Sequence, residues 1–261
     1  VGLCRVCLAM TTGLTDDLCG LFFKMCFLKI MILSYHRVNP WYDRDAITVS
    51  PTKFSKQIFY LLSKNFQFLT TERYVQEFFT QKSNKKVVIS FDDGYVDNLW
   101  FAFQILKDLK ISPIIYLTVS YIGTNILFPR YKDTSKDRFL NWQEVLQMTK
   151  DGVEFGSHTL THSYLTKIDR KQAEREIVES KKIIEDKIGK EIKFFCYPYG
   201  DFNSEIIEIV KKAGYKGAVV VRKKGMKITK FTLPRVGIYA HNNNLIYRAK
   251  IWREYIKERF Y

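Results

Sequence analysis

The chain has 261 residues, of which 46% are hydrophobic, and its formal net charge at pH 7 is +15. This length and composition can bury a large core, which excludes an unstructured tail and favours one globular domain. The positive charge allows an anionic glycan, an anionic membrane surface or nucleic acid as a neighbour. Because the Lys and Arg residues are scattered among Ile, Phe and Tyr without a nucleic-acid motif, no specific nucleic-acid partner is predicted, and a solvated basic surface is the simpler interpretation.

The N-terminal stretch differs from the rest of the chain. Four of the five cysteines lie in the first thirty residues, at Cys4, Cys7, Cys19 and Cys26. Cys4 and Cys7 form a CxxC, but no second pair follows at zinc-finger spacing, so ordinary apolar cysteines are the alternative to a zinc site. We interpret residues 1–28 as an N-terminal extension and residues 29–261 as the single folded domain.

Residues 1–28 also bear on location. They lack a basic region leading into an apolar run and a cleavage site, and no apolar stretch is long enough to span a bilayer. Met25 and Met31 lie at the edge of the first predicted strand, so a start at either leaves no room for a secretion signal. A cytoplasmic, reducing location is therefore expected, with the cell envelope as the alternative.

From residue 29 onward the sequence alternates between strand and helix patterns. Strands are predicted over 29–36, 66–70, 87–91, 112–120, 153–158, 193–196, 217–222 and 232–239. Helices are predicted over 50–64, 71–82, 96–110, 141–150, 170–188, 202–215 and 242–259. Helix starts are marked by Ser50-Pro51 and by Thr71 as an N-cap, and helix ends by Gly152, Gly189 and Gly214. This alternation predicts an α/β fold with a largely parallel sheet, an irregular (β/α)7-type barrel whose site lies at the C-terminal ends of the strands.

Two motifs at strand ends carry metal chemistry. Asp92 and Asp93 follow the buried strand VVISF and precede a glycine, and two adjacent carboxylates need a cation or a proton between them. After the short strand VEF, HTLTH places His158 and His162 four residues apart, which brings both imidazoles to one side of a tight turn. One Asp and two His leave positions open for water on a catalytic metal. Taken alone, DDG is more typical of a turn, and HTLTH is equally consistent with a structural zinc pair or a polar turn.

The connection over 120–140 is long, polar and aromatic, and it leaves a strand end on the face expected to hold the Asp pair. Long loops in compact domains are often functional, so this loop is a candidate substrate-contacting lip.

The ordered motifs FDDG at 91–94, HTLTH at 158–162 and YPYG at 197–200 resemble the first three motifs of the polysaccharide deacetylases, the NodB-homology or carbohydrate esterase family 4 group. The opening SYHRV at 34–38 and the late LPRVGI at 233–238 are similar to the permuted poly-N-acetylglucosamine deacetylase subgroup of bacterial biofilms. The resemblance covers about residues 29–240.

The resemblance implies a role for each motif. Asp93, His158 and His162 match the family's metal ligands, and Asp92 matches the catalytic base. The backbone N–H of Tyr199 would complete the oxyanion site, fixed by the turn at Pro198. Zinc is the expected metal, with cobalt, nickel and iron suited to the same ligands. Substrate-binding positions are expected at Tyr197, Pro198 and Gly200, with core packing as the alternative for the tyrosines.

Two departures from the family pattern leave alternatives open. His36 matches the histidine that the permuted subgroup uses as general acid, but the late leucine-x-histidine motif of the wider family is missing, so His241 remains a second candidate. Cys196 stands where the wider family has an arginine that orients the catalytic aspartate. Arg235 is the expected substitute from a neighbouring strand, and a surface position for it is the alternative.

The predicted function is metal-dependent removal of N-acetyl groups from N-acetylglucosamine-type sugars in a bacterial glycan or its precursor. An O-acetyl glycan esterase of the same fold is the first rival. A catalytically silent glycan-binding barrel is the second, and it would apply if the loss of arginine at Cys196 were not compensated.

Overall fold

The computed structural model describes residues 30–41, 45–78, 85–125, 138–221 and 225–257. The predictions about the four N-terminal cysteines and residues 1–28 lie outside this range, as does most of the expected lip over 120–140. In the described part of the chain, no helix combines the length and the apolarity needed to cross a bilayer.

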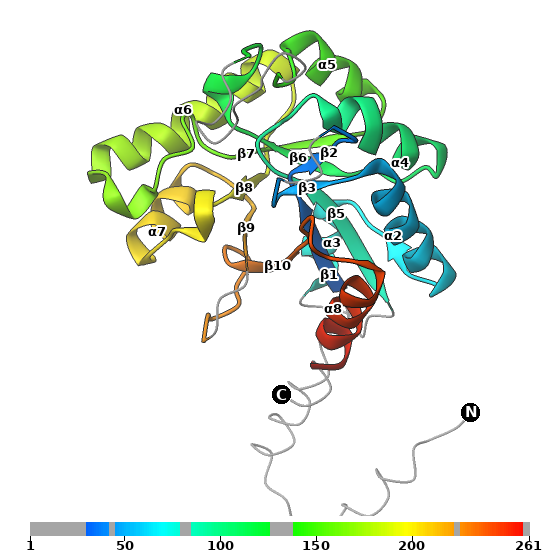
Figure 1. The fold of residues 1–261 in the computed structure, drawn as a ribbon. Coiled ribbons are helices and arrows are strands. Elements are labelled where there is room, and N and C mark those ends of the chain that lie inside the picture. Colours follow the sequence, from blue (N-terminus) through cyan, green and yellow to red (C-terminus); the bar gives the residue numbers. More distant parts are fainter. Residues whose placement is uncertain (1–29, 42–44, 79–84, 126–137, 222–224, 258–261) are drawn as a thin grey trace, which may run out of the picture.

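Seven parallel strands close into a barrel, as the alternation of elements predicted (Figure 1). Each strand pairs with its neighbour along the chain from β5 to β10, and β1 closes the ring by pairing with β10 on one side and β5 on the other. The barrel strands are β1 (Ile30–Tyr35), β5 (Lys86–Phe91), β6 (Ile114–Leu117), β7 (Glu154–Ser157), β8 (Phe194–Cys196), β9 (Gly217–Val221) and β10 (Leu233–Gly237).

Three short strands lie outside the ring. β4 (Gln67–Phe68) pairs with the first residues of β5, whereas β6 pairs with the last residues of β5, so β4 fills the gap below β6. β2 (Arg37–Val38) and β3 (Thr48–Val49) form a separate parallel pair.

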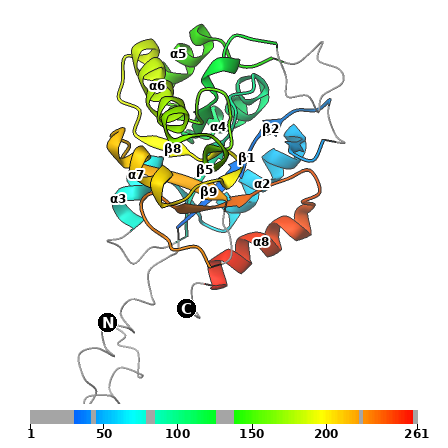
Figure 2. The same cartoon turned by 90° about the vertical axis from the view of Figure 1, so that its left-hand side faces the viewer.

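The helices lie around the outside of the barrel (Figures 1 and 2). They are α2 (Pro51–Ser63), α3 (Thr71–Phe78), α4 (Gln104–Asp108), α5 (Trp142–Lys150), α6 (Arg170–Ile188), α7 (Ser204–Lys212) and α8 (Asn244–Lys257). Short helical turns are η1 (Asn98–Phe103), η2 (Val119–Tyr121), η3 (Leu165–Lys167) and η4 (Pro198–Gly200).

Several helix boundaries follow from local sequence chemistry. The Ser50 hydroxyl accepts a hydrogen bond from the backbone of Lys53 at 3.3 Å, and Pro51 opens the helix, as predicted. Gly189 ends α6 in the left-handed conformation, with φ 72°.

Two helix predictions need correction. Thr71 is the first residue of α3, and the Thr70 hydroxyl accepts from the backbone of Arg73, so the capping residue is Thr70. The single helix predicted over 96–110 begins as the wider π-type turn η1 and becomes α-helical only at Gln104. Side-chain periodicity does not distinguish these two helix types, because both place an apolar stripe on the barrel.

The core has two layers separated by the barrel wall. The larger cluster lies between strands and helices, and the smaller one fills the barrel, with Ile32, Val88, Ile114, Tyr116, Phe194, Cys196, Val219 and Leu233 among its members. These inner residues recur at every second position of a strand, as side chains of a β-strand must. A Cβ at Gly156 would lie 2.5 Å from the Tyr116 ring and 2.8 Å from a backbone carbonyl, so glycine is required there to let Tyr116 into the barrel.

Candidate active site

The same alternation that fills the barrel also builds the candidate active site. On β1, Ile32 points inward, Ser34 follows it, and His36 stands at the strand end. On β5, Val88 points inward, and Ser90 and Asp92 follow at the next inward positions. The upper layer of the barrel interior is therefore polar, because these positions are filled by Ser, His and Asp.

Arg235 and Asp92 form a buried bidentate ion pair in this layer. Arg235 Nη1 lies 2.6 Å from Asp92 Oδ1, and Nη2 lies 2.7 Å from Oδ2. Both side chains are at most 3% exposed. The predicted substitute arginine therefore lies against the carboxylate it was expected to orient, and the alternative of a surface position does not apply.

The charge state of Asp92 follows from this pair. Burial alone raises the pKa of its carboxyl, but the charge and hydrogen bonds of Arg235 outweigh burial and hold the pKa well below its usual range. The Ser34 hydroxyl donates to Asp92 Oδ2 at 3.4 Å, and His36 Nε2 lies 3.9 Å from the same oxygen. Asp92 is therefore ionised at neutral pH and points at His36.

Cys196 takes part in the same cluster. Its Sγ lies 2.9 Å from Arg235 Nη2 and 3.7 Å from Asp92 Oδ1. Burial raises the pKa of the Cys196 thiol well above its ordinary value, so the thiol stays neutral. A small neutral side chain here leaves room for the guanidinium that arrives from β10.

Asp93 reaches the site through its backbone conformation. Strict alternation along β5 would point Asp93 out of the barrel, but the strand ends at Phe91 and Asp93 adopts φ 73°. The left-handed conformation is uncommon for a residue with a Cβ, and it persists where surrounding contacts impose it. Here it turns the second carboxylate toward HTLTH.

Asp93, His158 and His162 form a cluster of candidate metal ligands. Asp93 Oδ1 lies 3.7 Å from His158 Nε2 and 3.4 Å from His162 Nε2, and the two Nε2 atoms lie 3.2 Å apart. A tetrahedral ion with ligand bonds of about 2.0–2.1 Å holds its ligand atoms about 3.3 Å apart. The three atoms therefore already have the spacing that zinc requires.

The protonation of His158 also suits a metal ligand. Its Nδ1 lies 2.8 Å from the carbonyl oxygen of Cys196, and a carbonyl only accepts, so Nδ1 carries the proton and Nε2 presents its lone pair to the cluster. Burial, followed by the nearby His162, lowers the pKa of His158 to about 4. The imidazole is thus neutral at pH 7, as a ligand must be.

Glu176 on α6 holds the histidine loop in place, a role that sequence reasoning missed. Its buried carboxylate accepts from the backbone N–H groups of Leu160 and Thr161, both at 2.9 Å, and from the Thr161 hydroxyl at 2.7 Å. The Thr159 hydroxyl accepts from the backbone of His162 at 3.0 Å. These bonds fix the tight loop that brings both imidazoles to one side.

Tyr199 lies beside the ligand cluster on η4. It has φ 57°, its ring centroid is 4.5 Å from that of His162, and its ring stacks on Tyr164 at 3.8 Å with an interplanar angle of 6°. The two loops are also joined by Thr166, which donates to the Asp201 carboxylate from its backbone and its hydroxyl. Tyr164 was missed because its neighbours are ordinary loop residues.

The remaining YPYG positions differ from their predicted substrate contacts. Tyr197 is 1% exposed and donates its hydroxyl to the carbonyl of Phe231, so its side chain belongs to the core. Pro198 and Gly200 are also buried. These residues shape the turn that presents Tyr199, and the side-chain contact predicted for Tyr197 needs correction.

The two candidate acids occupy different environments. The His36 side chain is 21% exposed and lies next to Asp92 at the strand end. His241 is exposed on the loop before α8, where its ring lies against Tyr239. Of the two, the structure brings His36 to the cluster.

A second buried ion pair supports this face of the barrel. Arg37 Nε lies 2.8 Å from Asp97 Oδ2, both side chains are at most 1% exposed, and the guanidinium lies 4.7 Å from the Tyr95 ring centroid. The pair ties the residue after His36 to the loop after Asp93. The sequence signal for this ion pair was the arginine, Arg37, that directly follows the candidate catalytic residue His36.

Comparison with known proteins agrees with this geometry. A sequence model of the family described as polysaccharide deacetylase matches residues 80–218, which is more than half of the chain. A Bacillus subtilis protein named after the same family, YxkH, is 26% identical over 73% of this chain, and the chain spans 64% of its length. The poly-beta-1,6-N-acetyl-D-glucosamine N-deacetylase of Staphylococcus aureus is 28% identical over 72% of this chain and 67% of its own.

The fold has a close counterpart among solved structures. IcaB from Ammonifex degensii superposes with a TM-score of 0.71 at 19% identity, covering 86% of this chain and 97% of that one. The barrel, the motif order and the family match lead to one conclusion: this chain belongs to the polysaccharide deacetylase family.

Proposed function

We propose that the chain is a metal-dependent N-deacetylase that removes acetyl groups from N-acetylglucosamine-type residues of a glycan or its precursor. The observation that carries this proposal is the Asp93, His158 and His162 cluster beside the ionised Asp92. The similarity to a poly-N-acetylglucosamine N-deacetylase supports the substrate class.

The three ligand residues would hold a divalent metal, zinc being favoured by two imidazoles and a carboxylate. Bound there, the metal would act as a Lewis acid and make a water acidic enough for a weak base to deprotonate.

Asp92 is the proton acceptor in this proposal. Its pKa is low because of Arg235, so it is ionised at working pH and ready to accept a proton from the attacking water. The water oxygen bonds to the acetyl carbon, and the carbonyl oxygen gains negative charge. The backbone N–H of Tyr199 would donate to that oxygen, since its left-handed turn places the residue against His162.

His36 is the proposed proton donor to the leaving amine. It lies on the Asp92 side of the site, 3.9 Å from Oδ2, and its partial exposure allows contact with substrate. When the carbon–nitrogen bond breaks, the amine takes the proton from His36 and the acetyl group leaves as acetate.

Asp92→Asn separates this proposal from a silent binder. In the enzyme, the change should lower acetate release from N-acetylglucosamine oligomers by about 10²–10⁴-fold while zinc still binds at one equivalent. In a binder, the wild type would release no acetate, and Asp92→Asn would leave oligomer affinity unchanged. Acetate release from O-acetylated but not N-acetylated sugars by the wild type would instead establish the esterase.

A further inference from the structure

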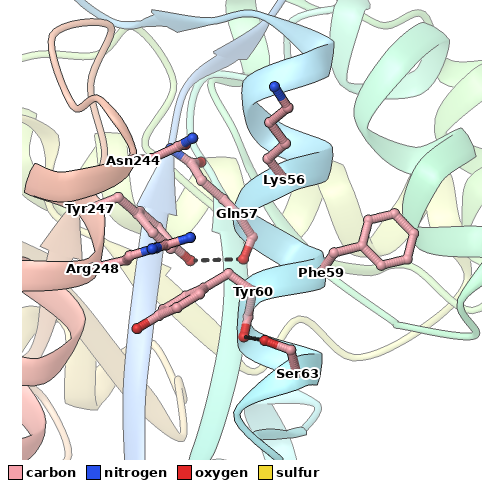
Figure 3. A pocket seen from close by; sticks show the side chains of 8 residues that line it. All are labelled: Lys56, Gln57, Phe59, Tyr60, Ser63, Asn244, Tyr247 and Arg248. Atoms are coloured by element: carbon pink, nitrogen blue, oxygen red, sulfur yellow. Dashed lines mark hydrogen bonds between the residues drawn. The ribbon is translucent and has the colours of Figure 1, made fainter.

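A pocket outside the candidate active site lies between α2 and α8 (Figure 3). Both helices belong to the outer layer of the barrel (Figure 2). Its volume is about 330 Å³, within the range of small-ligand pockets. The lining contains cations, amides and aromatic rings but no carboxylate: Lys56, Gln57, Phe59, Tyr60, Ser63, Asn244, Tyr247 and Arg248.

Arg248 lines this pocket, and no acidic partner is found for it among the described residues. Its guanidinium carbon lies 4.9 Å from the centroid of the Tyr60 ring, and the Tyr60 hydroxyl accepts from the Trp252 indole at 2.7 Å. Within the described ranges, no Asp or Glu pairs with Arg248 or with Lys56. The Arg248 guanidinium therefore lies over a ring face, and no carboxylate takes up its N–H donors.

The inner wall of the pocket is rigid. The Tyr35 hydroxyl donates to Gln57 Oε1 at 3.0 Å, and the Tyr247 hydroxyl donates to the Gln57 carbonyl at 3.4 Å. Gln57 and Tyr247 are both almost fully buried. The amide groups of Gln57 and Asn244 belong to the same lining (Figure 3). They add hydrogen-bond donors to those of the two cations.

The surrounding surface has an unbalanced positive charge. Residues 51–63 and 244–254 carry five basic side chains and one acidic side chain, Glu254. By contrast, α6 carries six basic and five acidic residues, so its charge is nearly neutralised on the helix itself. These two segments therefore carry a net charge of +4 beside the pocket, whereas α6 carries a net charge of +1.

We propose that this pocket binds a phosphate group, carried by an anionic lipid headgroup or by a free phosphate ester. Arg248 can present two parallel N–H donors to one edge of the group, and Lys56 and Asn244 can donate to its other oxygens. Phe59 and Leu245 lie on the same two helices and are 53% and 76% exposed. Their side chains can make apolar contacts with a membrane surface beside the pocket. The site does not depend on the proposed deacetylation, since none of its residues touches the Asp93 cluster.

The test compares full-length wild type with Lys56→Glu/Arg248→Glu and with the control Lys212→Glu. Lys212 is an exposed residue on α7, so Lys212→Glu reverses one charge on a helix that does not line the pocket. Binding is measured by co-sedimentation with phosphatidylglycerol vesicles, with phosphatidylcholine vesicles as the neutral reference, and by titration with glycerol phosphate. The pocket double variant should lose about tenfold or more of its affinity, and Lys212→Glu should lose much less.

The two binding measurements also identify the source of the phosphate group. Vesicle binding that glycerol phosphate does not displace supports the lipid headgroup, and saturable binding of glycerol phosphate supports a free ester. The proposal is overturned if neither probe binds. It is equally overturned if Lys212→Glu weakens binding as much per charge as the pocket changes do, because the attraction would then be a property of net charge alone.

Discussion

Replacing Arg235 with Met removes the only cation that forms hydrogen bonds to Asp92 within the described residues, at 2.6 and 2.7 Å. The carboxylate then loses the interaction that offsets its burial, so its pKa should rise. An opposite charge at this distance lowers an Asp pKa by about one to three units, and the acid limb of the kcat/KM profile should move up by about that many pH units. Leaving a buried charge without its partner should also cost about 3–5 kcal/mol of unfolding free energy at neutral pH.

The sign of the pH dependence can be stated for both forms. In the wild type the folded-state pKa of Asp92 is depressed, so the pair contributes stability above the usual Asp range and loses it as pH falls. In Arg235→Met that contribution is missing, and the gap in stability between the two proteins should narrow toward acid pH.

The assay is acetate release across pH at saturating zinc, with bound metal measured in parallel so that loss of ligands is not mistaken for titration of Asp92. Arg37→Met is a matched control, because it breaks another buried Arg–Asp pair on the same face and should destabilise the fold without moving the acid limb. An acid limb for Arg235→Met that coincides with the wild type would refute the reasoning.

Three further predictions test the site. His36→Ala should lower kcat by about 10²–10⁴-fold and His241→Ala by less than about twofold, and the reverse order in the same acetate assay would make His241 the acid. Tyr164→Ala removes the ring that stacks on Tyr199, a contact worth about 0.5–1.5 kcal/mol. The kcat should therefore fall up to about tenfold while oligomer affinity is retained, and Tyr164→Phe, which keeps the ring, should restore kcat. Glu176→Gln keeps the shape of the side chain but weakens three hydrogen bonds to the histidine loop. Zinc affinity in a calorimetric titration should therefore fall by about 10–100-fold. An unchanged zinc affinity would contradict the role of Glu176.

The barrel was predictable because each strand and helix has its own periodic pattern, and the order of the patterns fixes a parallel sheet. Its closure was harder to predict. β1 pairs with β5, yet β2, β3, α2, β4 and α3 lie between them in the chain. No local pattern encodes a contact over that separation, because it depends on how many strands fit around the interior.

Site residues on strand ends were predictable from motifs that follow buried strands and from their resemblance to a known family. Arg235 was expected near Asp92 as the substitute, from a neighbouring strand, for the family arginine missing at Cys196, and the structure places the two side chains in contact. Tyr197 was misassigned because its neighbour Cys196 already faces inward, which turns the Tyr197 ring to the layer between barrel and helices. Glu176 was missed because it stands in a highly charged helix, where a glutamate is most often on the solvent side.

Backbone conformation carries the part of the site that no side-chain pattern predicts. Asp93, Thr159, His162 and Tyr199 all have positive φ, and each changes the direction in which a chain segment presents its groups. Such conformations are imposed by tertiary contacts such as the Tyr164 stack, so they become visible only once the loops are placed together.

The most direct test of the central claim is zinc titration of the metal-free protein, followed by acetate release from N-acetylglucosamine oligomers, with Asp93→Ala alongside. The account predicts one tightly bound zinc per chain, release that appears only with metal, and loss of both in Asp93→Ala. Acetate release of equal rate in the metal-free protein, or in Asp93→Ala without bound zinc, would contradict it.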